Sequence, residues 1–310
     1  MRVIITGGSG LLGKPLAAEL AQSGYEVIVL SRDPARAANS LPPGVRAHKW
    51  DARTAADWGH LADGAHAIIN FAGESIAGSG RIPARWSEKR KRAIYESRIY
   101  AGLAVVEAIE AAAVKPQMLL QASAVGYYGQ RQDDDILTEA SPAGADFLGQ
   151  TCQAWEDATA PVEQMGVRRA IARTGLVLTT AGGPLPITIF QTKLFAGGPI
   201  GGGRQWWPWI HLRDEIDALK FLLQNEKASG PFNLTAPNPV PQKAFARTLG
   251  RVMNRPSLLP APEIALRLAL GEIATLVLDG QRALPQRLLD LGFTFRHPDL
   301  FYALRDIVRR

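Results

Sequence analysis

A glycine-rich turn near the N-terminus constrains the fold more than any other feature of the chain. The apolar run Val3 to Thr6 indicates a buried strand, and a helical pattern opens at Gly13. Gly7 and Gly10 allow a tight turn between them, while Gly13 allows the helix to pack closely on the strand. Such a turn presents backbone N–H groups at a helix N-terminus, where a diphosphate binds well. The residues expected to contact it are Gly7, Gly10, Leu11, Leu12 and Gly13.

Short apolar runs alternate with longer helical patterns through the first 175 residues. A nearly continuous apolar run is typical of a strand that is covered on both faces, and the intervening helices supply the covers. The chain is therefore predicted to be an α/β protein with a doubly wound parallel sheet of the Rossmann type. The expected strands are Val3 to Thr6, Glu26 to Ser31, Ala67 to Ala72, Met118 to Ser123 and Ala170 to Thr174.

The composition of the sequence changes after residue 175, where glycine- and proline-rich segments separate short elements. We expect a dinucleotide-binding domain over residues 1–180, joined by a returning strand near 231–236. Residues 181–310 are expected to form a smaller α/β substrate lobe that is mostly helical toward its C-terminus.

The end of the second expected strand indicates which dinucleotide binds. A carboxylate at this point accepts from the ribose 2′-hydroxyl of NAD(H), whereas an arginine accommodates the 2′-phosphate of NADP(H). Here the strand ends in Ser31-Arg32, and Asp33 precedes Pro34 in the pattern of a helix N-cap. A guanidinium makes paired, charge-assisted bonds to phosphate, and the Ser31 hydroxyl can add a donor. NADP(H) is therefore the predicted cofactor.

Further cofactor contacts are predicted from position along the chain. Asp51 follows an expected third strand, where its carboxylate either accepts from the adenine amino group or belongs to an ordinary loop. Small residues after the strand that ends near Asn70 let the backbone pass the cofactor. The contacts expected there are Phe71, Ala72, Gly73 and Glu74.

Composition excludes several classes of protein. The formal net charge of +6 does not come from one contiguous basic stripe, so a nucleic-acid partner is not expected. Cys152 is the single cysteine, which rules out an internal disulfide, and the five histidines show no zinc-type spacing, so no metal is expected. The chain shows no signal peptide and no 18-residue uncharged apolar run, so we expect a cytoplasmic protein without a membrane partner. Its oligomeric state is not readable.

Motifs along nearly the whole chain resemble the extended short-chain dehydrogenase/reductases, the group that includes the sugar-nucleotide epimerases. The resemblance is greater to an atypical branch known only as epimerase-family proteins. Besides the glycine turn and Ser31-Arg32, it rests on Asn70 to Glu74, Arg85-Trp86, Ser97-Arg98, Tyr127-Tyr128-Gly129, Trp155-Glu156, Gly198 to Gly201, Trp209-Ile210-His211, Leu291-Gly292-Phe293 and Phe295-Arg296. In this branch the segment around Arg98 passes the cofactor diphosphate, so the resemblance implies that Arg98 is a charged clamp.

The resemblance also implies hydride chemistry on a small substrate, in which a serine and a tyrosine contact the substrate oxygen and a lysine lowers the pKa of the tyrosine. Ser123 matches the family serine and is expected to contact both substrate and cofactor. The tyrosine position holds Leu148 and the lysine position holds Cys152, and neither side chain can replace that pair. Ordinary epimerase or dehydrogenase catalysis is therefore in question.

Three interpretations remain open. In the first, another residue supplies the acid. The candidates are Tyr127 or Tyr128, just beyond Ser123, and His211 from the second lobe. Aromatic residues in a loop, however, usually pack against a core. Alternatively, the protein binds NADP(H) without turnover, as a sensor or a partner-binding protein. In the third interpretation, substrate or water provides the proton. The substrate itself is not readable from the sequence.

Overall fold

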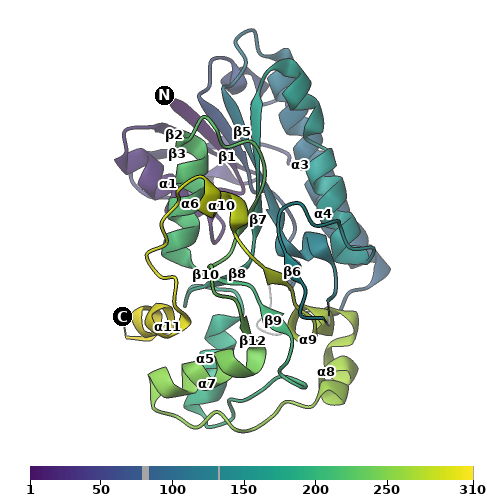
Figure 1. Ribbon diagram of the computed structural model, residues 1–310. Coiled ribbons are helices and arrows are strands. Elements are labelled where there is room, and N and C mark those ends of the chain that lie inside the picture. Colours follow the sequence, from purple (N-terminus) through teal and green to yellow (C-terminus); the bar gives the residue numbers. More distant parts are fainter. Residues whose placement is uncertain (79–83, 132, 310) are drawn as a thin grey trace.

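A parallel seven-stranded sheet forms the centre of the computed structural model, which describes residues 1–78, 84–131 and 133–309 (Figure 1). The strand order is β11-β7-β5-β4-β1-β2-β3, and every neighbouring pair is parallel. The doubly wound parallel sheet predicted from the apolar runs is confirmed. Its strands are β1 (Arg2–Thr6), β2 (Glu26–Ser31), β3 (Val45–Lys49), β4 (Ala67–Asn70), β5 (Met118–Ala124), β7 (Arg168–Thr174) and β11 (Gly230–Leu234).

Both faces of the sheet are covered by helices. Alternate strand residues point to opposite faces, so Val3 and Ile5 of β1 pack in one core and Ile4 in the other. The first core lies under α1 (Gly13–Gln22) and α6 (Leu212–Gln224), and the second under α3 (Glu88–Ala111) and, beside it, α4 (Phe147–Asp157) (Figure 1). The apolar runs of the sequence are thus explained by burial on two sides.

The direction of winding reverses beside β1. From β1 the chain proceeds to β2 and β3 on one side, and it then crosses to β4 on the other side of β1. Connections leave β1 and β4 on opposite faces, which opens a crevice at the carboxyl ends of these strands. The glycine-rich turn between β1 and α1 lies at this crevice, so the fold places the predicted phosphate-binding segment where ligands of such sheets bind.

A smaller lobe is built from the second half of the chain. Its core gathers Trp207, Trp209 and Phe245 with apolar residues of the surrounding helices. In Figure 1 this lobe lies below the carboxyl edge of the sheet. Its elements are β8 (Leu176–Leu178), α5 (Leu185–Lys193), β9 (Trp206–Trp207), β10 (Trp209–His211), β12 (Val240–Pro241), α7 (Gln242–Met253), α8 (Glu263–Leu270), α9 (Thr275–Leu278) and α11 (Leu300–Val308).

The two halves of the chain are interleaved. β11 pairs with β7 at the edge of the central sheet, and α6 packs on the same sheet although both elements follow residue 181. Phe293 and Phe295 also bury their rings in that core. The remaining elements of the described residues are α2 (Pro34–Ala38), β6 (Ile136–Leu137), β13 (Arg282–Ala283), α10 (Gln286–Asp290) and four 3₁₀ segments. Among the described residues, no helix combines the length and apolar character needed to cross a membrane.

Candidate cofactor and catalytic site

The glycine turn has the geometry that close backbone approach requires. Gly7 has a φ of +65°, and a Cβ on it would lie 2.8 Å from the carbonyl carbon of Phe71. A Cβ on Gly13 would lie 2.5 Å from the carbonyl oxygen of Gly7 and from the Cα of Gly8. No side chain of the described residues caps the N-terminus of α1, where the N–H of Lys14 donates to the carbonyl oxygen of Gly10 at 3.1 Å. This arrangement suits a diphosphate.

A pocket of about 680 Å³ opens beside this turn. Gly7 and Gly10 line it at one point, the end of β2 lines it at another, and the segment after β4 closes a third side. The predicted contacts that line the pocket are Gly7, Gly10, Ser31, Arg32, Phe71, Ala72, Gly73 and Glu74. The lining also includes residues that were not predicted as contacts, among them Ser9, Arg36, Ser40, Trp50 and Ser97.

Two guanidinium groups lie at the β2 end of the pocket. Arg32 and Arg36 are exposed, line the pocket and make no side-chain ion pair within the described residues. Asp33, the single acidic residue of this segment, accepts from the backbone N–H of Arg36 at 3.0 Å. The predicted role of Asp33 as the N-cap of α2 is therefore confirmed. The β2 end of the pocket therefore carries two cationic groups, and the one carboxylate of this segment, that of Asp33, is engaged by the helix.

Asp51 is engaged in its own turn. Its Oδ1 accepts from the N–H groups of Arg53 and Thr54, and its Oδ2 accepts from the Thr54 hydroxyl at 2.9 Å. The pKa of this carboxyl lies below its usual range because these hydrogen bonds outweigh the cost of partial burial. Trp50 and Ala52 line the pocket on either side of it. The contact of Asp51 with adenine stays a prediction.

A buried chain of polar side chains supports the carboxyl ends of β1, β4 and β5. The Thr6 hydroxyl donates to Oδ1 of Asn70 at 2.6 Å, and the Asn70 amide donates to Oε1 of Gln121 at 2.9 Å. Thr6 also accepts from the N–H of Ala72 at 3.1 Å, which fixes the segment that lines the pocket. Sequence reasoning missed this chain. Its signal was a polar residue near the end of each otherwise apolar strand.

Arg98 of α3 is buried behind the same segment. Its Nη1 donates to the carbonyl oxygen of Glu74 at 3.1 Å, and its guanidinium lies 4.9 Å from the centre of the Trp155 ring. A Cβ on Gly73 would come within 3.1 Å of the Arg98 Cζ, so a larger residue there would require the Arg98 side chain to shift. Burial lowers the pKa of Arg98. The structure places Arg98 as a support for the pocket wall, and its contact with the diphosphate stays a prediction.

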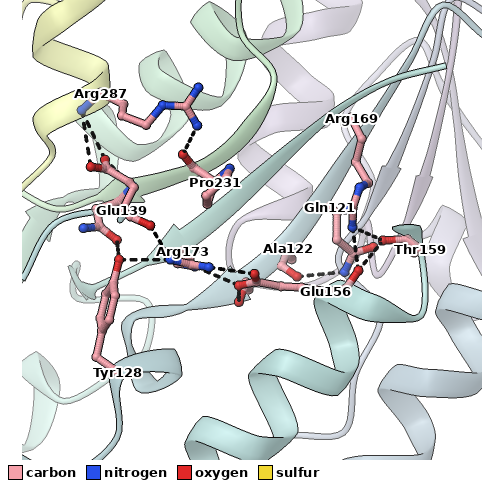
Figure 2. Close-up of polar contacts among 12 residues, drawn as sticks. Gln121, Ala122, Tyr128, Glu139, Glu156, Thr159, Arg169, Arg173, Pro231 and Arg287 are labelled. Atoms are coloured by element: carbon pink, nitrogen blue, oxygen red, sulfur yellow. Dashed lines mark hydrogen bonds and ion pairs between the residues drawn. The ribbon is translucent and has the colours of Figure 1, made fainter. Parts of the chain in front are cut away.

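Ser123, at the end of β5, is bound to a buried ion pair. Figure 2 shows this pair, which Glu156 forms with Arg173. Its hydroxyl donates to Oε1 of Glu156 at 2.6 Å. Arg173 of β7 donates to both carboxylate oxygens of Glu156, at 2.9 and 2.8 Å. A carboxylate held in this way only accepts, so the Ser123 proton points to Glu156. The contact of Ser123 with substrate and cofactor stays a prediction.

The two tyrosines that follow Ser123 differ in environment. Tyr128 is fully buried, where its hydroxyl donates to Asn233 at 2.6 Å and accepts from Arg173 at 3.2 Å. Burial raises the pKa of Tyr128 to about 12, which does not suit a group that exchanges protons near neutrality. Tyr127 is half-buried with the Arg173 guanidinium 3.4 Å from its ring centre. This geometry favours packing for Tyr128, and a catalytic role for Tyr127 stays a prediction.

Leu148 and Cys152 both face the turn that carries these tyrosines. A Cβ on Gly126 would lie 3.5 Å from the Leu148 Cβ and 3.9 Å from the Cys152 Sγ. Cys152 is buried, and burial raises its thiol pKa to about 11, so the thiol is neutral and inert. The structure thus brings Leu148 and Cys152 against the turn that carries Tyr127 and Tyr128, and neither side chain can replace a tyrosine or a lysine.

The fold gathers three possible metal ligands that sequence spacing did not reveal. Ligand atoms of His211, His297 and Asp306 all lie within 4.8 Å of one another. However, Nδ1 of His211 accepts from the N–H of Arg213 at 3.0 Å, so the neutral ring carries its proton on Nε2, which is 3.3 Å from Asp306. A metal would need the lone pair that this proton occupies. The group therefore fits a cap of α6 and a polar contact between His211 and Asp306 of α11.

Known proteins place the chain in a family. A family model described as NAD dependent epimerase/dehydratase family matches residues 3–147. The chain is 40% identical to the epimerase family protein YfhF of Bacillus subtilis over 308 residues, which cover 99% of this chain and 98% of that protein. This chain belongs to the epimerase family. A plant relative, the SDR39U1 homolog of Arabidopsis thaliana chloroplasts, is 38% identical and is covered over 87% of its length.

A solved structure extends the similarity of this epimerase-family chain to three dimensions. The human epimerase family protein SDR39U1, crystallised with NADPH, superposes with a TM-score of 0.88 at 29% identity, and each chain is covered completely. Residues 261–307, which include α8, α9 and most of α11, match a domain of unknown function. The predicted resemblance to the epimerase-like short-chain dehydrogenase/reductases is thereby confirmed.

Proposed function

We propose that this epimerase-family protein binds NADP(H) and uses it as an oxidoreductase or epimerase on a small-molecule substrate, with a sugar nucleotide as the first class to test. The observation that carries the cofactor assignment is that Arg32 and Arg36 line the pocket at the end of β2 and have no ion-pair partner among the described residues. The NADPH bound to the human relative supports it. The uncapped helix above the glycine turn would receive the diphosphate.

The first test is cofactor preference. We expect NADPH to bind about tenfold or more tightly than NADH, because charge-assisted arginine–phosphate bonds contribute roughly 1.5–3 kcal/mol. Arg32→Ala should narrow the gap, and Arg32→Ala combined with Arg36→Ala should remove it. Fluorescence titration of both cofactors measures this. Arg46→Ala is the matched control, since Arg46 is exposed on β3 and pairs with Glu26 outside the pocket. Equal affinities in the unmodified protein contradict the assignment.

A second candidate function has a specific observation in its favour. Leu148 and Cys152 stand where a tyrosine and a lysine are needed, and the Ser123 proton is directed to Glu156. A protein with a cofactor site but without a proton donor would serve as an NADP(H)-dependent sensor.

Turnover separates the two functions. Cofactor absorbance at 340 nm is followed against carbonyl compounds and nucleotide sugars, with chromatography of the sugars to detect epimerisation without net redox change. An enzyme should convert at least one class, and Ser123→Ala should slow it by about 100-fold, as loss of an active-site hydrogen-bond partner does. Tight NADPH binding with no conversion of any class favours the sensor. Conversion unaffected by Ser123→Ala contradicts the role of Ser123.

A further inference from the structure

Arginines that are scattered in the sequence lie together on the C-terminal lobe. Arg247 and Arg251 stand one turn apart on α7, and Arg255 follows the end of that helix. All three line an open depression of about 750 Å³ that also includes Phe301 of α11. Arg305 of α11 joins them, because the guanidiniums of Arg251 and Arg305 both lie over the Phe301 ring, at 5.5 and 5.9 Å.

These four cations have no acidic partner in the described part of the chain. All four residues are exposed, and no side-chain ion pair or hydrogen bond engages their guanidiniums there. Arg255 also stacks on a ring, 4.8 Å from the centre of Phe195. A guanidinium that lies on an aromatic face keeps its N–H donors directed outward along its edge. Three of the four guanidiniums thus lie near aromatic rings, and the N–H donors of all four have no acceptor among the described residues.

Stabilisation of a helix C-terminus would be the simplest alternative role for arginines near the end of α7. Arg168 has that role at α6, because its side chain donates to the carbonyl oxygens of Leu222 and Leu223 in the last turn and of Ala228 beyond the helix. In the described structure Arg247, Arg251 and Arg255 make no such bond. Their arrangement is open to a ligand.

We propose that this depression is a second anion site, which binds phosphate groups. Guanidiniums bind phosphate through paired N–H donors, and several around one hollow favour a diphosphate or a phosphate ester over a monovalent anion. Ser257, which lines the depression, is 9% exposed and has a buried hydroxyl without a partner among the described residues. That hydroxyl is a further donor for a bound oxygen.

The phosphate group can belong to a soluble molecule or to a phospholipid headgroup. Leu258 and Leu259 stand at the rim with 77% and 59% of their surface exposed, an arrangement in which apolar side chains would enter a lipid surface beside cationic groups. The two sources share the same recognition by arginine. Free pyrophosphate and anionic vesicles distinguish them.

The experiment uses the full chain saturated with NADPH, so that the cofactor pocket is occupied. Titration calorimetry with sodium pyrophosphate tests the soluble source, and sedimentation with phosphatidylglycerol vesicles, compared with phosphatidylcholine vesicles, tests the headgroup. Binding in either arm, weakened by added salt, is the expected result. Binding in neither arm overturns the proposal.

Variants assign the binding to the depression. Arg247→Ala, Arg251→Ala and Arg255→Ala together should weaken binding about tenfold or more while leaving NADPH affinity unchanged. The matched control removes the same charge from exposed, ion-paired arginines elsewhere, as Arg46→Ala, Arg92→Ala and Arg267→Ala. Equal losses in both triple variants mean a nonspecific effect of net charge and overturn the proposal. If the alanine variant does not fold, the corresponding triple lysine variant retains charge but loses the paired donors, and it should also bind more weakly than the original chain.

Discussion

Gly13→Ala is expected to weaken NADPH binding by about 100-fold or more, which corresponds to roughly 2.7 kcal/mol or more. The added Cβ would lie 2.5 Å from the Gly7 carbonyl oxygen and the Gly8 Cα, and 2.9 Å from the Gly8 carbonyl carbon. All three are backbone atoms of the turn itself, so the clash can be relieved only by moving the N–H groups that would hold the diphosphate. Fluorescence titration with NADPH measures the loss.

Two further variants make this result specific. Gly10→Ala should have a smaller effect, because its Cβ would stand 3.1 Å from one atom, the Gly7 oxygen. Gly24→Ala lies beyond the other end of α1, where a Cβ meets nothing within 4 Å but φ is +84°. The Gly24→Ala substitution strains the backbone at the end of the helix without contacting the glycine turn, so it should leave NADPH affinity unchanged. Undiminished NADPH binding by Gly13→Ala would contradict a diphosphate site at this turn.

Glu156→Ala is expected to lower the free energy of unfolding by about 3–5 kcal/mol. Burial lowers the pKa of Arg173, but the hydrogen bonds and charge of Glu156 outweigh this and raise it above its ordinary value. Without Glu156, the Arg173 guanidinium stays buried with only neutral acceptors, the Tyr128 hydroxyl and the Glu139 carbonyl. Ser123 loses its acceptor as well. Urea denaturation followed by circular dichroism measures the change.

The chain contains a matched comparison for this ion pair. Glu163 also pairs with an arginine, since Arg169 Nε donates to it at 2.8 Å, but the Glu163 side chain is 50% exposed. Glu163→Ala should therefore cost less than about 1 kcal/mol. Glu156→Gln keeps an acceptor for Ser123 and should fall between the two alanine variants. If Glu156→Ala costs no more than Glu163→Ala, the buried pair does not stabilise the protein.

The features that could be predicted from sequence are those set by local chemistry. Two-sided burial of β1, β4 and β5 leaves an apolar run in each, and this alone identifies a covered parallel sheet. Gly13 is needed because of its immediate neighbours in the turn. Asp33 is followed by proline at the first helical position, and it caps α2 as that pattern indicates. Each signal lies within a few residues of its effect.

The features that escaped prediction depend on contacts between distant segments. Glu156 meets Ser123 across 33 positions, and Tyr128 meets Asn233 across 105. Packing against a core was one of the expectations for Tyr128, but nothing near it in the sequence indicates its contact with Arg173 of β7. The arginines of α7 and α11 look scattered for the same reason. Only the packing of these two helices brings Arg251 and Arg305 onto one phenylalanine ring.

The pairing of β11 with β7 has a consequence for how this protein is made. While the chain emerges during synthesis, the segment that forms β7 is complete more than 50 residues before Gly230–Leu234, the strand that covers its edge. An unpaired edge of a parallel sheet is open to wrong partners, and contacts this distant in sequence form slowly. The edge of β7 therefore stays unpaired while the residues of β8, α5, β9, β10 and α6 are synthesised. Domains usually fold one after another on the ribosome, whereas here the two lobes must mature together.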